Sequence, residues 1–190
     1  MSILITGGAG FIGSHLTKTL LDRGETIVSI DNFDPFYPKQ QKLENLSLLK
    51  GKNFKFHEMD VRDIGMKKFL LDNEVEKLVH LAARPGVRPS LPNAKLYEEI
   101  NVAGTLNMLE ASISSNIKNF VFISSSSIYG NLAKTPWKEE FDPMPNSPYA
   151  ASKLAGEAYV KTYAELYSLP TSALRYFSIY GIGQRPDLAI

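Results

Sequence analysis

The stretch ILITGGAGFIGSHL, residues 3–16, places a glycine-rich turn between a β-rich apolar run and a helical pattern. Gly8, Gly10 and Gly13 fit G-x-G-x-x-G, and Gly7, Gly10 and Gly13 fit the wider G-x-x-G-x-x-G. Glycines there permit a tight turn, let the backbone approach a pyrophosphate and let the helix pack closely on the strand. The helix then offers free N–H groups and a partial positive charge to an anion. The segment therefore predicts the phosphate-binding turn of a dinucleotide site, with a glycine turn that binds nothing as the alternative.

Short apolar runs recur along the chain, and helical patterns separate most of them. Several runs lack polar alternation, as expected of strands that are covered on both faces. Alternation of strands and helices indicates a Rossmann-like doubly wound α/β fold, in which helices cover both faces of a parallel sheet. We expect strands at residues 3–6, 26–31, 54–60, 77–83, 120–126 and 172–177, and helices at residues 11–23, 62–73, 96–113 and 147–167.

The composition narrows the classes of function. The chain has 190 residues, enough for one domain, with 44% hydrophobic residues and a net charge of +1. This charge gives no electrostatic reason to expect nucleic acid or an anionic membrane as a partner. The absence of cysteine excludes disulfides, thiol catalysis and thiolate metal sites. Because His15, His57 and His80 lack ligand spacing, we expect no metal site.

Two acidic residues end predicted strands on the side of the glycine turn. Asp31 follows the turn by about 20 residues, where a carboxylate in this fold bonds the adenosine ribose hydroxyls. Its charge would repel a 2′-phosphate and no arginine follows at once, so NAD is favoured over NADP. An Asx-type turn before Asn32 is a compatible alternative. Asp60 ends the third predicted strand, where it can bond an adenine amino group or cap the helix that begins near Arg62.

A tyrosine–lysine pair lies at the start of the last predicted helix, for which Ser147 suits the N-cap and Pro148 the first position. Tyr149 and Lys153 are four residues apart, so both side chains project from one helix face. A free tyrosine has a pKa near 10 and is a weak base at neutral pH, whereas a nearby ammonium group and a positive nicotinamide stabilise the phenolate. The pair is either an acid–base couple or a packed tyrosine beside a solvated lysine.

The chain resembles the extended short-chain dehydrogenase/reductase superfamily, in particular its nucleotide-sugar epimerase and dehydratase branch. The resemblance rests on TGGAGFIG (6–13), DN after the second strand, HLAA (80–83), NVAGTLNMLEA (101–111), SSSSIYG (124–130), SPYAASK (147–153) and LRYFSIYG (174–181). It implies that Tyr149 is the acid/base, Lys153 its pKa-lowering partner and Ser125 the hydrogen-bonding hydroxyl, with Ser124 and Ser126 as neighbouring alternatives. It also implies cofactor contacts from Gly7, Gly10, Phe11, Ile12, Gly13, Asp31, Asn32, Asp60, Val61, Leu81, Ala82, Ala83, Asn101, Tyr149 and Lys153.

The resemblance bears on the reaction as well. Dehydratases of this branch need an Asp-Glu pair directly after the catalytic hydroxyl, where this chain has Ser126 and Ser127. It therefore implies an NAD-dependent UDP-sugar 4-epimerase, in which C4 is oxidised and hydride returns to the other face. UDP-glucose/UDP-galactose and UDP-glucuronate/UDP-galacturonate both stay open, because Ser178 replaces an asparagine of many glucose epimerases and Arg185 is either a uronate-binding residue or a solvated turn residue. The implied substrate contacts are Ser126, Ser127, Ser178 and Arg185.

Other functions are kept as alternatives. A 4,6-dehydratase or a uronate decarboxylase of the same branch would yield a deoxy-keto sugar or CO₂. A non-catalytic NAD-binding sensor is a different class, although such proteins often lose the tyrosine or the lysine, and this chain keeps both.

The two ends of the chain bear on its cellular location and on the extent of the domain. Met1 leads directly into the first predicted strand with no signal sequence, and no apolar run approaches the ~18–20 residues of a membrane span. We expect a cytoplasmic protein that does not contact a membrane. Because QRPDLAI follows a strand and a turn with no closing element, we expect residues 1–190 to be an NAD-binding Rossmann domain that lacks most of the substrate-binding part. By family analogy, we expect a homodimer formed through the helices at 96–113 and 147–167.

Overall fold

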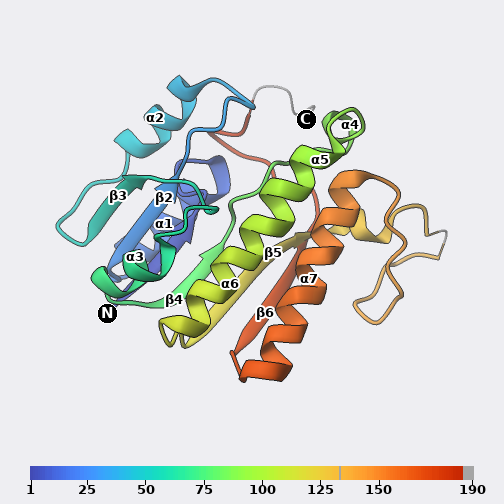
Figure 1. Ribbon diagram of the computed structural model, residues 1–190. Helices are drawn as coiled ribbons and strands as arrows, with labels where there is room; N and C mark the ends of the chain where they lie inside the picture. The colour runs from blue at the N-terminus through green and yellow to red at the C-terminus, as the bar shows by residue number, and fades with distance from the viewer. Residues whose placement is uncertain (133, 186–190) are drawn as a thin grey trace.

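The computed structural model describes residues 1–132 and 134–185 and confirms the Rossmann-like fold (Figure 1). One sheet holds six parallel strands in the order β3-β2-β1-β4-β5-β6. Thr6, the last residue of β1, pairs with Ile30 of β2 and His80 of β4. Since all strands run in one direction, their carboxyl ends meet at one edge, where open α/β sheets bind ligands. The strands are β1 (Ser2–Thr6), β2 (Ile27–Asp31), β3 (Phe54–Glu58), β4 (Val75–His80), β5 (Asn119–Ser125) and β6 (Thr171–Tyr176).

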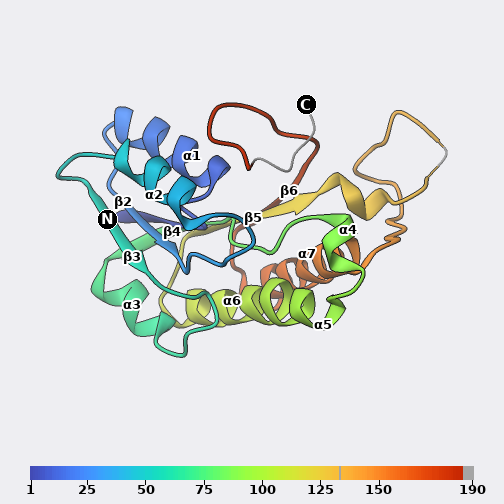
Figure 2. The ribbon, with the colours of Figure 1, turned by 90° about the horizontal axis from the view of Figure 1, so that it is seen from above.

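Helices cover both faces of the sheet. Helices α1 and α2 lie on one face, and α3, α6 and α7 lie on the other (Figures 1 and 2). In the part of the chain that the structure describes, no helix is both long enough and apolar enough to cross a membrane. The helical segments are α1 (Phe11–Asp22), α2 (Lys39–Ser47), α3 (Met66–Asp72), α4 (Val87–Ser90), α5 (Ala94–Tyr97), the π-helical η1 (Glu98–Ala103), α6 (Gly104–Ser114), the 3₁₀ helix η2 (Ser126–Tyr129) and α7 (Pro148–Tyr167).

Two predicted helices differ from the observed ones. Helix α3 begins at Met66 rather than Arg62, because Asp60 and Asp63 form a turn in which each main-chain N–H bonds the other residue. The helix predicted at 96–113 has the expected extent, but its first half is α5 followed by the π-helical η1. Isolated π-helical turns often occur at functional sites. Here the turn carries Asn101, whose side chain organises the loop after β4.

Helix α2 has no counterpart among the helices that the sequence predicts. Its buried residues are polar, namely Lys42 and Asn45. Lys42 Nζ lies 2.8 Å from Asp31 Oδ1, and Asn45 Nδ2 donates to the carbonyl of Ala9 at 3.1 Å. A helix whose buried face is polar has no hydrophobic periodicity, so the usual pattern cannot reveal it.

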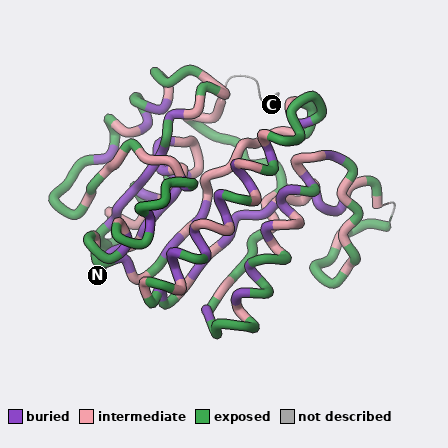
Figure 3. The backbone as a smooth tube through the Cα atoms, in the orientation of Figure 1, coloured by how far each residue is buried: buried purple, intermediate pink, exposed green. Residues whose placement is uncertain are grey.

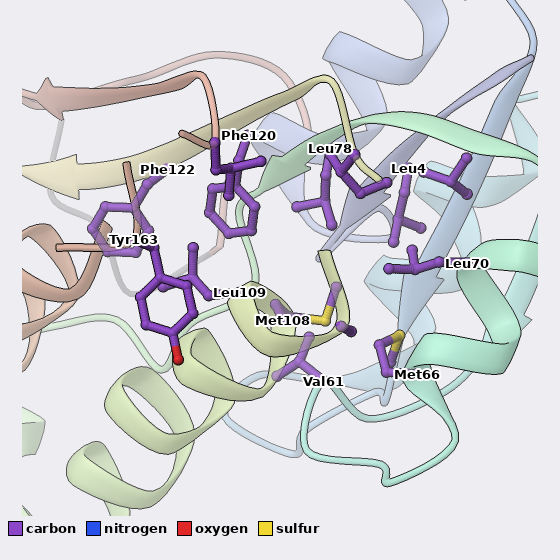
Figure 4. Close-up of a cluster of buried hydrophobic side chains, with 14 of the residues drawn as sticks. Leu4, Val61, Met66, Leu70, Leu78, Met108, Leu109, Phe120, Phe122 and Tyr163 are labelled. Carbon is purple, nitrogen blue, oxygen red and sulfur yellow. The ribbon is translucent and has the colours of Figure 1, made fainter. Parts of the chain in front are cut away.

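The main hydrophobic cluster lies between the sheet and the helices α3, α6 and α7 (Figure 4). Buried residues follow the central strands and the inward faces of these helices, whereas outer turns and loops are exposed (Figure 3). A Cβ at Gly156 would lie 2.5 Å from the ring of Phe122, so α7 approaches β5 closely at this point. The close approach brings Lys153, one turn earlier on α7, to the end of β5.

Replacing Phe120 with alanine should lower the free energy of unfolding by about 3–5 kcal/mol, because its ring is completely buried in this cluster. Urea denaturation followed by circular dichroism measures the change. Leu166→Ala, at a position 69% exposed on α7, is the control and should change stability by less than about 0.5 kcal/mol. A loss of under 1 kcal/mol for Phe120→Ala would contradict this packing.

Candidate functional site

A cavity of about 730 Å³ opens at the carboxyl edge of the sheet. The turn after β1, the loops after β2 and β4, the end of β5 and the start of α7 form its walls. Every predicted cofactor, substrate or catalytic residue lines this cavity except Asn101. The structure therefore brings together segments that are far apart in the sequence, with the glycine turn at one part of the cavity and the Tyr149–Lys153 pair at another.

The glycine turn is built for close approach. Gly7 has φ +71°, which favours glycine, and its carbonyl accepts a bond from the Gly10 N–H at 3.1 Å. A Cβ at Gly13 would collide with the Gly7 carbonyl and lie 2.8 Å from the Cα of Gly8. Gly10 is the N-cap of α1 and provides no side-chain hydrogen bond, so the first amides of the helix have no capping acceptor. An anion such as a pyrophosphate fits this arrangement.

Asp31 and Lys42 form a buried ion pair beside the turn. Their side chains are 5% and 8% exposed, and Lys42 Nζ lies 2.8 Å from Asp31 Oδ1. The same Oδ1 accepts a bond from the Phe33 N–H at 2.9 Å, which is the Asx-type turn considered above. Since both bonds involve Oδ1, Oδ2 is the oxygen suited to a ribose hydroxyl. Lys42 also lies 5.1 Å from the ring of Tyr37, whose pKa is raised to about 12 by burial and by the charge of Asp31, against an opposing effect of Arg185.

Asp60 is held by several donors at the end of β3. The Arg62 side chain bonds both carboxylate oxygens at 2.8 Å, the Arg62 N–H bonds Oδ1 at 2.8 Å, and Asn32 Nδ2 bonds Oδ2 at 2.7 Å. The Arg62 hydrogen bond is the main reason why the pKa of Asp60 falls to about 2. Asp60 thus caps the turn before α3, ties the loop after β2 to that after β3, and still lines the cavity.

The start of α7 places the tyrosine–lysine pair. Ser147 is the N-cap as predicted, and its Oγ accepts a bond from the Ala150 N–H at 3.1 Å. Lys153 is 4% exposed, and its Nζ donates to the carbonyl of Ile123 at 2.7 Å. Burial lowers the pKa of Lys153 to about 8, and the charge of Glu157 acts in the opposite direction.

The environment of Tyr149 differs in part from the expectation. Burial raises the pKa of its phenol, whereas the hydrogen bond with Ser125 and the charge of Arg185 act to lower it. The Lys153 ammonium group bonds the Ile123 carbonyl at 2.7 Å and is not among these causes. A lowering of the Tyr149 pKa by Lys153 therefore stays a prediction. Ser125 ends β5, and its Oγ accepts a bond from the Ser127 N–H at 3.2 Å.

Asn101 does not line the cavity, and its contact with the cofactor stays a prediction. It is 2% exposed, and its Oδ1 accepts a bond from the Arg84 N–H at 2.7 Å. Its Nδ2 donates to the Arg84 carbonyl at 3.1 Å and to Ser152 Oγ at 2.9 Å. Ser152 Oγ in turn donates to the Tyr149 carbonyl at 2.8 Å. Asn101 therefore links the loop after β4 to the first turn of α7.

A buried histidine continues this network into the sheet. His80 Nδ1 lies 2.9 Å from Thr6 Oγ1, and Nε2 lies 3.1 Å from Thr105 Oγ1. Thr105 donates to the carbonyl of Asn101 at 2.6 Å, so its oxygen accepts from His80, which assigns the proton to Nε2. Burial, assisted by the charge of Lys153, lowers the pKa of His80 to about 3 and keeps the ring neutral at neutral pH.

Several cavity residues are not among the predicted site residues. The loop after β2 contributes Asp34, Phe36 and Tyr37, α2 contributes Lys42, and the loop after β4 contributes Arg84. Asp34, Phe36, Tyr37 and Lys42 lie in the charged and aromatic segment after the DN motif, whereas Arg84 directly follows the HLAA motif, a position that also suits contact with cofactor or substrate phosphates. Within residues 1–132 and 134–185, no group of three or more His, Cys, Asp or Glu side chains is arranged to hold a metal ion.

Comparisons with known proteins agree with this architecture. The sequence model of the family described as GDP-mannose 4,6 dehydratase matches residues 4–189. The chain belongs to this family. Protein CapI of Staphylococcus aureus is 40% identical over 193 residues, which cover 100% of this chain and 58% of CapI. A UDP-glucuronate 4-epimerase of Thermodesulfobacterium geofontis is 40% identical over 190 residues, which cover 98% of this chain and 58% of that protein.

A solved structure is similar to this chain in fold as well as in sequence. The crystal structure of the UDP-glucuronic acid 4-epimerase from Bacillus cereus, in complex with UDP-glucuronic acid and NAD, superposes with a TM-score of 0.93 at 39% identity. The match covers 100% of this chain and 60% of that chain. The resemblance to the extended short-chain dehydrogenase/reductase superfamily is thus confirmed, and the chain spans about 58% of the length of the curated relatives named above.

The neutral state of His80 predicts a pH-dependent stability. Unfolded histidine has a pKa of about 6.5, whereas that of folded His80 is about 3. Between these two pKa values only the unfolded chain binds this proton. The contribution of His80 to the free energy of unfolding is therefore fully present above pH 6.5. It then falls with decreasing pH toward 3, by up to about 1.4 kcal/mol per pH unit.

Urea denaturation at pH 7, 6 and 5 measures this contribution. We expect His80→Gln to lose it, so that the stability of the wild type relative to this variant decreases with decreasing pH. The exposed His15 is the control, and His15→Gln should keep the wild-type slope. Equal slopes for the wild type and His80→Gln would show that His80 is not a buried neutral group.

Proposed function

We propose that this chain is the dinucleotide-binding and catalytic part of an NAD-dependent nucleotide-sugar 4-epimerase. The observation that supports it most is that Tyr149, Lys153 and Ser125 line the same cavity as the uncapped glycine turn and Asp31. An acid–base residue and a dinucleotide-binding turn in one cavity suit hydride transfer from a hydroxyl-bearing carbon. The family membership and the relatives named as epimerases point in the same direction.

The residues present fit NAD. The glycine turn and the first amides of α1 suit the pyrophosphate, and Asp31 Oδ2 suits the adenosine ribose. Asn32 and Asp60 lie near the expected adenine, and Lys153, whose Nζ is near the end of β5, suits the nicotinamide ribose. When bound, NAD would supply the hydride acceptor and donor for C4 of the sugar and leave the cycle unchanged.

The chain's own residues would handle the proton. Tyr149 takes the proton of the C4 hydroxyl as C4 is oxidised and gives it back when C4 is reduced on its other face. Ser125 is hydrogen-bonded to the phenol of Tyr149. This bond orients the phenol hydroxyl and favours the phenolate. Among the described residues, the acidic ones that line the cavity are Asp31 at the end of β2, and Asp34 and Asp60 in the loops after β2 and β3. With Ser126 and Ser127 after Ser125, the described part of the chain places no acid there for elimination, and this favours epimerisation over dehydration.

A UDP-uronate is the favoured sugar nucleotide. Arg185 lines the cavity and its charge acts on Tyr149, and an arginine there suits a carboxylate at C5 of the sugar. Ser126, Ser127 and Ser178 line the same part and can donate to that carboxylate. Relatives at 37–40% identity named UDP-glucuronate 4-epimerase agree with this choice over UDP-glucose.

The test is to incubate the purified full-length protein with UDP-glucuronate, UDP-glucose and UDP-GlcNAc and to separate the products by chromatography. We expect UDP-galacturonate from UDP-glucuronate, and Tyr149→Phe should lower its rate by about 10²–10⁴-fold while leaving NAD bound. Tyr167→Phe, at an exposed position on the same helix, is the control and should keep the wild-type rate. A deoxy-keto sugar, CO₂ or no conversion with NAD still bound would instead favour a dehydratase, a decarboxylase or a sensor.

The Asp31–Lys42 pair predicts how cofactor preference can be changed. Asp31→Ser removes the charge that repels a 2′-phosphate and releases the ammonium of Lys42 beside that position. We expect the affinity for NADPH to rise about tenfold or more, and the affinity for NADH to fall. Titration followed by nicotinamide fluorescence measures both. In the double variant Asp31→Ser/Lys42→Met the gain for NADPH should disappear, and its persistence would show that Lys42 is not the phosphate-binding group.

A further inference from the structure

An ion pair lies in the wall of the cavity that the glycine turn also lines. Arg84 Nη1 lies 2.9 Å from each carboxylate oxygen of Asp34, and the two side chains are 19% and 25% exposed. Asp34 follows β2 and Arg84 follows β4, and the sheet order places β1 between these two strands. Since neighbouring strands lie ~4.8 Å apart, the pair spans strands separated by about 10 Å. It therefore bridges the end of β1, where the turn for the pyrophosphate begins.

Both ends of this bridge are held in place. The Asn101 side chain bonds the N–H and the carbonyl of Arg84. On the other side, the Asp34 N–H donates to Asn32 Oδ1 at 3.0 Å, and Asp34 Oδ1 accepts a bond from the Phe36 N–H at 2.9 Å. The guanidinium group of Arg84 also lies over the ring of Phe36, 5.1 Å from its centroid. The bridge is thus a braced part of the cavity wall, and not a pair of free surface side chains.

The guanidinium group of Arg84 also hydrogen-bonds the Tyr97 side chain, but one of its nitrogens is left without a partner. Arg84 Nε is buried, and among the described residues it has no hydrogen-bond partner, although Nη1 bonds Asp34. A buried N–H without an acceptor is unfavourable, and an arginine fork commonly bonds two acceptors side by side. Arg84 lines the cavity together with the glycine turn, so an acceptor that enters from the cavity suits this atom. Next to a phosphate-binding turn, the chemistry that fits is a phosphate oxygen.

We propose that Arg84 and Asp34 form a strap over the bound dinucleotide, with Arg84 Nε donating to a phosphate oxygen, and that this strap slows release of the cofactor. The proposal rests on the proposed function, in which the cavity binds NAD. In an epimerase the dinucleotide is regenerated in each cycle, so slow release costs no turnover. Asp34 keeps the arginine across the cavity, and Arg84 makes the contact with the ligand.

The experiment measures release of NADH from the purified protein. Protein loaded with NADH is mixed with excess NAD in a stopped-flow instrument, and the loss of bound-NADH fluorescence gives the dissociation rate constant. We expect Asp34→Asn to raise it about tenfold or more by breaking the bridge, and Arg84→Gln to raise it further. Arg84→Lys keeps the charge but lacks Nε, and its release should also be at least about fivefold faster than that of the wild type.

Asp22→Asn is the matched control, because it breaks the exposed Lys18–Asp22 pair on α1 and should release NADH at the wild-type rate. Urea midpoints identify any variant that does not fold, and the remaining strap variants then carry the test. Release within twofold of the wild type for folded Asp34→Asn or Arg84→Lys would overturn the strap while leaving the proposed function intact. A wild-type protein that binds no NADH would instead refute the proposed function, and the strap with it.

Discussion

The close approach of α1 to the turn after β1 determines where the rest of the site lies. No side chain fits at Gly13, and a Cβ at Gly8 would lie 2.5 Å from the Cβ of Ser29 on β2. Helix, turn and second strand are therefore in backbone contact, and the N-terminus of α1 points at the edge of the sheet. This contact fixes the position for an anion. The neighbouring strands then decide what surrounds it, with Asp31 at the end of β2 and the loop that carries Arg84 after β4.

That loop depends on a second constraint, which is a buried layer of polar groups above the apolar sheet. Thr6, His80, Thr105 and Asn101 are all at most 2% exposed and are joined by hydrogen bonds. Buried polar groups specify structure only when each of them has a hydrogen-bond partner. This layer meets that condition because the neutral imidazole accepts from Thr6 and donates to Thr105. Its last member, Asn101, holds the backbone of Arg84. The position of the loop thus follows from side chains of β1, β4 and the η1–α6 segment.

The sequence predicts the fold and most of the cavity wall, since both depend on local patterns. Apolar runs, glycine spacing and a capped helix start are visible without knowledge of tertiary contacts. The errors occur where polar tertiary contacts determine whether a segment is helical or which residues a side chain bonds. Helix α2 is missed because it buries Lys42 and Asn45, and Lys42 is missed with it, although it reaches Asp31 from eleven residues along the chain. The NVAGT motif marks the correct segment, but the partners of Asn101 depend on how a loop and α7 approach it.

The acid–base group and the strap are physically connected under the proposed function. Burial opposes charge on both Tyr149 and Lys153, raising the pKa of the first and lowering that of the second to about 8. Lys153 is bonded to the Ile123 carbonyl and is not among the groups that shift the pKa of the phenol. A ligand that draws the Lys153 ammonium group from the Ile123 carbonyl toward the phenol and brings a positive ring beside Tyr149 would favour the phenolate. The strength of the base would then depend on cofactor occupancy, and a contact that delays cofactor release would also preserve the ionisation that catalysis needs.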